Sequence, residues 1–171
     1  PHLDRALALY REQRDPFGTA FTEALLGEQA LLKGDYPTAE TRLRAALAYV
    51  RSLGDVPTDP ELHMMATNDL GVAISNLRPG HPEATALKRE GIAVADRDRF
   101  SAGASVIGRA NLGLDFYNIG DLDEADTLFR EALRRLEALP VPLPERGFLF
   151  NNLSQLRRVQ DASLHRPGER G

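Results

Sequence analysis

The stretch LLGEQALLKGDYPTAETRLRAAL at residues 25–47 has a second copy, NLGLDFYNIGDLDEADTLFREAL, at residues 111–133. The two copies align without a gap. Each carries Leu-Gly, then Gly-Asp seven residues later, and then an alanine, a bulky apolar residue and a second alanine at helical spacing. The repeat therefore predicts a hairpin of two helices in each copy.

Each position of the repeat has a physical role. A glycine in the middle of the first helix, Gly27 or Gly113, lets the second helix approach closely. The Gly-Asp pairs at 34–35 and 120–121 can end the first helix and supply an N-cap for the second. The two alanines lie on one face of the second helix, where small side chains make room for the next helix.

One weaker copy lies between these two, and another follows them. Leu70-Gly71 opens a copy in which the second helix begins one residue late, at 82–84. Leu153-Ser154 opens a further copy that lacks a second helix of the same kind, which predicts a capping helix. Apolar residues at helical spacing within residues 3–10 predict a helix before the first hairpin.

The expected fold is therefore all-α. Residues 1–164 would form one array of helical hairpins, and residues 165–171 would form a polar tail. The expected elements are a helix at 2–14, hairpins at about 18–53, 61–97 and 101–139, and a cap helix at about 144–162.

Composition limits the class of protein. The chain has 171 residues, of which 42% are hydrophobic, enough to bury a continuous core. It has no cysteine and no long apolar run, which favours a cytoplasmic protein without a membrane span. The net charge of −4 argues against direct binding of nucleic acid. Pro1, in place of an initiator methionine, indicates a segment of a longer protein.

The Leu-Gly, Gly-Asp and paired-alanine spacing resembles the tetratricopeptide repeat (TPR) family over nearly the whole chain. The matching positions 27, 71, 113 and 154 are 44, 42 and 41 residues apart, which is longer than the standard repeat of about 34. Such long repeats are similar to those of kinesin light chain and of the sensor arms of MalT-like bacterial transcriptional regulators.

The resemblance implies a right-handed α-solenoid whose first helices line a concave groove. It also implies a protein-binding or peptide-binding scaffold, used in signal transduction as part of a larger bacterial regulator. In such regulators the array receives a partner protein or a small-molecule inducer. A third hypothesis is a structural module that self-associates through the apolar ends of the array.

The groove residues can be projected from the Leu-Gly anchor of each copy. The first copy gives mainly apolar positions, and the later copies are rich in asparagine. The candidate ligand-binding residues are Asn68, Asp69, Asn76, Asn111, Tyr117, Asn118, Asn151, Asn152, Gln155 and Arg158.

Asparagine is unfavourable inside a helix, so its recurrence calls for a reason. One interpretation is capture of a peptide, because the amide can pair with both backbone groups of an extended ligand. The other is a ladder of asparagines that joins neighbouring helices. Four apolar side chains near the groove are either ordinary core or an adaptable binding surface: Met64, Met65, Ile107 and Phe148.

Enzyme motifs fail on chemistry, so we expect a protein that is not an enzyme and needs no cofactor. The segment GASVIGRA at 103–110 has the glycine spacing of a phosphate loop, but Arg109 and Ala110 replace its lysine and hydroxyl. No metal site is expected, because the histidines are scattered and the acidic run at 121–126 lacks the glycine of a calcium loop.

Overall fold

The computed structural model describes residues 2–54, 56, 58–97, 102–139, 151 and 154, and its regular elements within those ranges are all helical. The predicted all-α class is therefore confirmed. The elements are α1 His2–Glu12, α2 Pro16–Leu32, α3 Tyr36–Ser52, α4 Pro60–Met64, a π-helical turn Met65–Asp69, α5 Leu70–Leu77, α6 Pro82–Arg97, α7 Ala102–Asn118 and α8 Leu122–Glu137.

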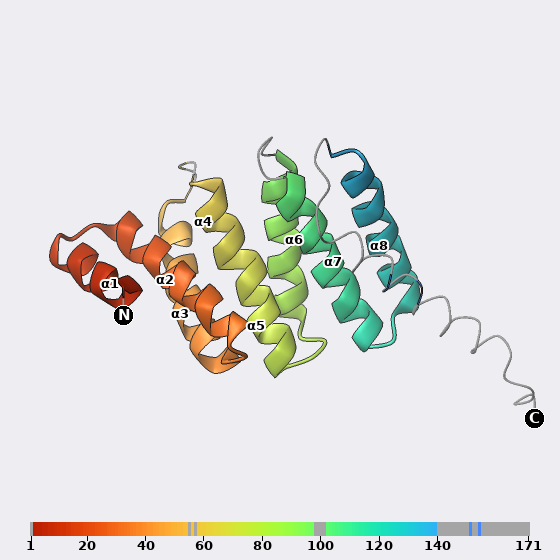
Figure 1. The fold of residues 1–171 in the computed structure, drawn as a ribbon, viewed down its shortest axis with the longest axis horizontal. Helices are drawn as coiled ribbons and strands as arrows, with labels where there is room; N and C mark the ends of the chain where they lie inside the picture. The colour runs from red at the N-terminus through yellow and green to blue at the C-terminus, as the bar shows by residue number, and fades with distance from the viewer. Residues whose placement is uncertain are drawn as a thin grey trace, which may run out of the picture.

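The helices stand side by side in a row from α1 to α8 (Figure 1). Helix α2 packs against α3, and α7 packs against α8. Between these pairs, α4, the π turn and α5 follow one another as a single long helix, and α5 packs against α6. The described part of the chain thus forms three successive helix pairs, with α1 packed on α2.

One expected helix is shorter in the structure, and another lies mostly outside the described residues. The helix predicted at 2–14 ends at Glu12, because Arg14 adopts a left-handed conformation with φ of 55° before Asp15 caps α2. The expected cap helix at 144–162 lies outside the described residues except for Asn151 and Ser154, which are helical and exposed.

The Gly-Asp turns form as the repeat predicted. Gly34 and Gly120 have φ of 74° and 86°, a conformation that glycine adopts without steric cost. The carboxylate of Asp35 accepts a hydrogen bond from the backbone N–H of Thr38 at 3.2 Å, and Asp121 caps α8 in the same way. Sequence and local structure agree here because the turn needs both residue types.

The glycine in each first helix faces the bulky residue of its second helix. A methyl group added at any of the three glycines would lie 2.5–2.9 Å from that opposing side chain, which is closer than packed atoms approach. The absence of a side chain therefore sets the distance between the paired helices. The three contacts are Gly27–Leu43, Gly71–Lys88 and Gly113–Phe129.

The core runs between the pairs as well as within them. One buried cluster joins α2 and α3 to α5 and α6. Another joins α2 and α3 to α4 and the π turn, and a third lies between α7 and α8. The alanines that the repeat placed on the second helices are fully buried: Ala39, Ala46, Ala125 and Ala132. None of the described helices is long and apolar enough to cross a membrane.

A pair of equivalent ion pairs connects successive second helices. Arg44 contacts Glu83 at 2.7 Å, and Arg89 contacts Glu124 at 2.7 Å. In both ion pairs the arginine directly follows the bulky residue of its helix. The glutamate directly precedes the first alanine in the second helix of the following helix pair. We call these two contacts the arginine–glutamate seam. Because the side chains are largely exposed, each contact contributes at most about 1 kcal/mol.

Candidate functional site

One hollow, of about 260 Å³, lies beside the π turn and is lined by predicted groove residues, and we call it the Met64 hollow. The first helices of all three pairs contribute to its wall, together with α6. Its lining residues are Glu28, Met64, Met65, Asn68, Asp69, Gly91, Ile92, Ala104, Ile107 and Gly108.

The π turn places Asn68 and Asp69 in this hollow. It covers residues 65–69 in the middle of the long helix, where Thr67 is fully buried. The Thr67 hydroxyl donates a hydrogen bond to the carbonyl of His63 at 2.8 Å, a contact that accompanies distorted helical turns. Single π turns are frequent at functional sites because the extra residue redirects the side chains around it.

The polar groups of the hollow are incompletely paired. The Asn68 side-chain amide donates a hydrogen bond to the Asp69 carboxylate at 3.1 Å, while the Asn68 carbonyl oxygen is buried and has no hydrogen-bond partner among the described residues. Burial, aided by the nearby charge of Glu28, raises the pKa of Asp69 from 3.8 to about 6. A carboxylate held this way destabilises the fold at neutral pH, which is typical of a functional group.

We expect Asp69→Asn to raise the free energy of unfolding by about 2 kcal/mol at pH 7.5, since an amide keeps the bond from Asn68 without the buried charge. The folded protein binds the Asp69 proton more tightly than the unfolded chain, so its stability falls as pH rises from about 4 to 6. Urea unfolding of both proteins at pH 4, 5, 6 and 7.5 measures the difference. The variant's advantage should be small at pH 4 and full above pH 6, and a pH-independent difference would contradict this account.

A second hollow of about 270 Å³, the Asn76 hollow, lies at the other end of the same helices. Its lining residues are Ser75, Asn76, Pro79, Gly80, Asp115, Asn118 and Ile119.

Beneath the Asn76 hollow lies a buried lysine, Lys88, which is only 1% exposed. Its ammonium group contacts the Asp115 carboxylate and lies 3.1 Å from the Ser75 hydroxyl. Burial lowers the pKa of Lys88, and the Asp115 carboxylate acts in the opposite direction. A serine beside a lysine can act as a nucleophile and its base, but the base must be neutral. The Asp115 carboxylate stabilises the charged lysine, so the arrangement favours a structural ion pair.

The structure distributes the predicted groove residues over several places. Asn68 and Asp69 line the Met64 hollow, whereas Asn76 and Asn118 line the Asn76 hollow. Tyr117 packs against the core cluster of α7 and α8. Asn111 on α7 is half-buried, and Asn151 is exposed. The remaining three candidates lie outside the described residues: Asn152, Gln155 and Arg158.

The described asparagines do not join neighbouring helices through one another. The Asn76 amide donates a hydrogen bond to the Val72 carbonyl of its own helix at 2.9 Å, and the Asn68 amide donates to the adjacent Asp69. Both contacts stay within one helix. Hydrogen bonding of these two side chains therefore gives no support to the ladder interpretation.

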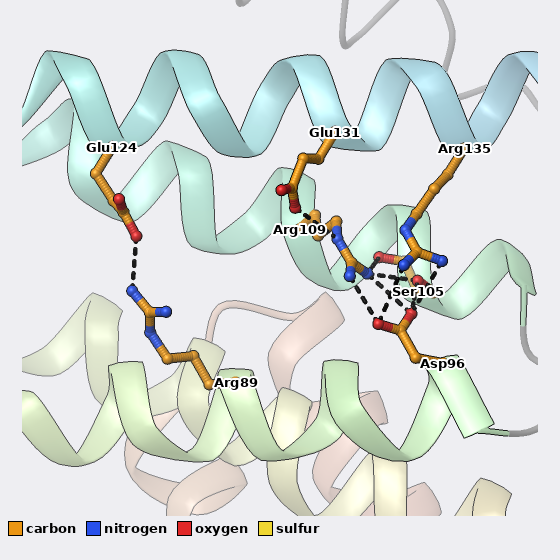
Figure 2. A network of polar contacts seen from close by, with 7 residues as sticks. All are labelled: Arg89, Asp96, Ser105, Arg109, Glu124, Glu131 and Arg135. Carbon is orange, nitrogen blue, oxygen red and sulfur yellow. Dashed lines mark hydrogen bonds and ion pairs between the residues drawn. The ribbon is translucent and has the colours of Figure 1, made fainter.

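A separate polar network joins α6, α7 and α8 around Arg109 (Figure 2). The Arg109 side chain is 8% exposed and donates to both oxygens of Asp96, at 3.1 and 2.7 Å, and to Glu131 at 3.3 Å. The hydrogen bond from Arg109 lowers the pKa of Asp96. The glycine-spaced segment at 103–110 is thus part of helix α7, and its arginine serves to bind helices together.

Sequence reasoning missed part of the Met64 hollow. It considered the two methionines and Ile107 as either core or binding surface, and they line the hollow. It did not find Ile92, Gly91 or Gly108, because their contribution depends on how α6 and α7 pack beside the π turn. In the described part of the chain, no group of three or more histidine, aspartate or glutamate side chains is arranged to hold a metal ion.

The repeat and the geometry of the Met64 hollow are the features of this chain that bear on its function. No protein-family model matches this chain, and no curated protein matches its sequence.

Proposed function

We propose that this chain is a TPR-like scaffold, a right-handed α-solenoid that binds a peptide or protein segment along the face formed by its first helices. Support comes from the three helix pairs, which repeat the same glycine contact and the same Gly-Asp turn or an equivalent short connection. In arrays of this kind each pair covers the apolar face of its neighbour and leaves one face of the first helices for ligands.

The observation that carries the proposal is the position and chemistry of the Met64 hollow. Helices α2, α4 and α7 belong to three different pairs, and each contributes to its wall. Met64 and Met65 are flexible and polarisable, and Ile107 at the rim is 38% exposed. A ligand on this face would contact all three pairs at once and bury apolar surface there.

The Met64 hollow is smaller than the pockets that usually enclose a drug-sized ligand. Pockets for drug-sized ligands usually enclose roughly 300–1,000 Å³, and this one has about 260 Å³. It fits one side chain of a longer ligand, whose remaining residues would lie along the first helices. The long repeat spacing favours a place for this scaffold in a larger cytoplasmic regulator of bacteria, as its interaction or sensor segment.

Selection from a phage-displayed library of random dodecapeptides tests the proposal. The parent chain is the bait, and the matched variants are Ile107→Lys, at the rim of the hollow, and Val56→Lys, at an exposed position away from it. We expect selected peptides to bind the parent and Val56→Lys equally, and Ile107→Lys about tenfold more weakly. Fluorescence anisotropy with synthetic peptides measures the three affinities.

Two results would reject peptide binding at this site. One is a selection that enriches no sequence over an unrelated helical protein used as bait. The other is a set of peptides that bind Ile107→Lys as tightly as the parent. Circular dichroism of both variants checks that the substitutions leave the helices intact.

A further inference from the structure

The Met64 hollow also indicates the chemistry of the side chain that it takes. We propose that it receives an ammonium group on an aliphatic stem, supplied by a lysine side chain of the bound segment. This inference rests on the proposed function, since it names the anchoring residue of the peptide.

The ionisable side chains that line the hollow are all acidic. Of its lining residues only Glu28 and Asp69 ionise, and both are acids. Neither the exposed Glu28 nor the half-buried Asp69 forms an ion pair within the described part of the chain, whereas three half-buried or buried carboxylates elsewhere contact a cation at 2.5–3.0 Å. Those paired carboxylates are Glu23, Asp96 and Asp115. At those three carboxylates the chain itself supplies an arginine or lysine as the partner. A cationic ligand would supply the corresponding positive charge to Glu28 and Asp69.

The number of acceptors matches an ammonium group. An ammonium carries three N–H donors and no acceptor. The hollow presents two carboxylates, Glu28 and Asp69, and the Asn68 carbonyl oxygen, which is buried beside Gly108 and has no partner among the described residues. A buried acceptor that lacks a donor costs free energy until a donor reaches it. A ligand that donates hydrogen bonds at this point removes that cost.

The rest of the wall matches the stem of a lysine. Apolar side chains from three helices surround the polar groups: Met64, Met65, Ile92 and Ile107. Lysine buries its methylene groups against such surfaces and keeps its charge at a polar end. A hydroxyl or amide side chain would lack the charge for the two carboxylates, and an apolar side chain would leave the Asn68 carbonyl oxygen without a donor.

The chain offers a direct reporter of this hollow, because Met64 and Met65 are its only two methionines and both line the wall. Protein labelled with ¹³C at the methionine methyl groups gives two signals, one from each residue. Titration with n-pentylammonium chloride at pH 7.5, and with n-pentanol as the uncharged counterpart, measures the preference for charge. The variants are Asp69→Asn and, as a control at an exposed acid outside the hollow, Glu12→Gln.

We expect pentylammonium to shift the methionine signals at concentrations about fivefold or more below those of pentanol. Asp69→Asn should lose this preference, while Glu12→Gln should keep it. Equal effects of the amine and the alcohol, or a preference that survives Asp69→Asn, would overturn the inference. Because Asp69→Asn is expected to be at least as stable as the parent, loss of the preference cannot be attributed to unfolding.

The peptides selected from the library test whether a lysine side chain supplies the ammonium group. Replacing a lysine of a selected peptide by norleucine, which keeps the aliphatic stem, should weaken binding about tenfold. Peptides that bind through Ile107 but tolerate every such replacement would overturn the lysine anchor and leave the proposed function standing. Failure to select any peptide would reject the proposed function, and the pentylammonium titration would still report on the chemistry of the hollow.

Discussion

Asp115→Ala is expected to lower the free energy of unfolding by about 3 kcal/mol, because it leaves the Lys88 ammonium buried without its carboxylate. Lys88 is almost completely inaccessible, and its other contact, the Ser75 hydroxyl, cannot neutralise a charge. The Asp115 side chain itself is 20% exposed, so water offsets part of the cost. Urea unfolding followed by circular dichroism measures the loss.

The matched rescue comes from the repeat itself. Leu43 in the first pair occupies the position of Lys88 in the second, and each lies against the glycine of its first helix. Lys88→Leu combined with Asp115→Ala removes both charges and supplies a side chain suited to that place. We expect the double variant to recover most of the lost stability. A double variant as unstable as Asp115→Ala alone would show that the ion pair does not account for the effect.

Phe129→Ala is expected to cost about 4 kcal/mol, because Phe129 is fully buried at the centre of the cluster between α7 and α8. Its ring lies against Gly113, where a methyl group would come within 2.9 Å of the ring edge. The ring therefore has close contacts on the glycine side as well as with the cluster, and alanine would leave a cavity. Thermal and urea unfolding both report this change.

Ile119→Ala is the control for Phe129→Ala, because the Ile119 side chain is 50% exposed and should contribute less than about 0.5 kcal/mol. Equal losses for the two variants would contradict the assignment of Phe129 to the core. A loss for Phe129→Ala below about 1 kcal/mol would mean that the α7–α8 pair closes over the missing ring.

Much of the fold follows from local chemistry that is visible in the sequence. The turn at Gly34-Asp35 needs a glycine for its backbone and a short acceptor for the cap, so the residue types mark the place. The same holds for Gly113, because a close approach of two helices requires the absence of a side chain. These signals act over a few residues, and a single repeat unit displays them completely.

The site was harder to predict because its geometry depends on helix phase and on packing between pairs. The projection of groove residues assumed a regular helix up to Gly71, but the π turn at residues 65–69 changes the direction of side chains before it. No proline or glycine marks that turn. Lys88 was also hidden, since a lysine at a core position becomes intelligible only when Asp115 of the next pair is seen beside it.

The arginine–glutamate seam has a consequence for how the molecule can change over generations. Arg44 and Arg89 occupy equivalent places in their pairs, as do Glu83 and Glu124. The α5–α6 pair carries both Glu83 and Arg89, so a tandem copy of its gene segment would bring a glutamate and an arginine to the new junction. The seam would match there without further substitution, but Lys88 of the first copy would face Ala73 in place of Asp115 and lose its carboxylate. Lengthening by duplication therefore suits the exposed seam, and the buried lysine would have to change with it.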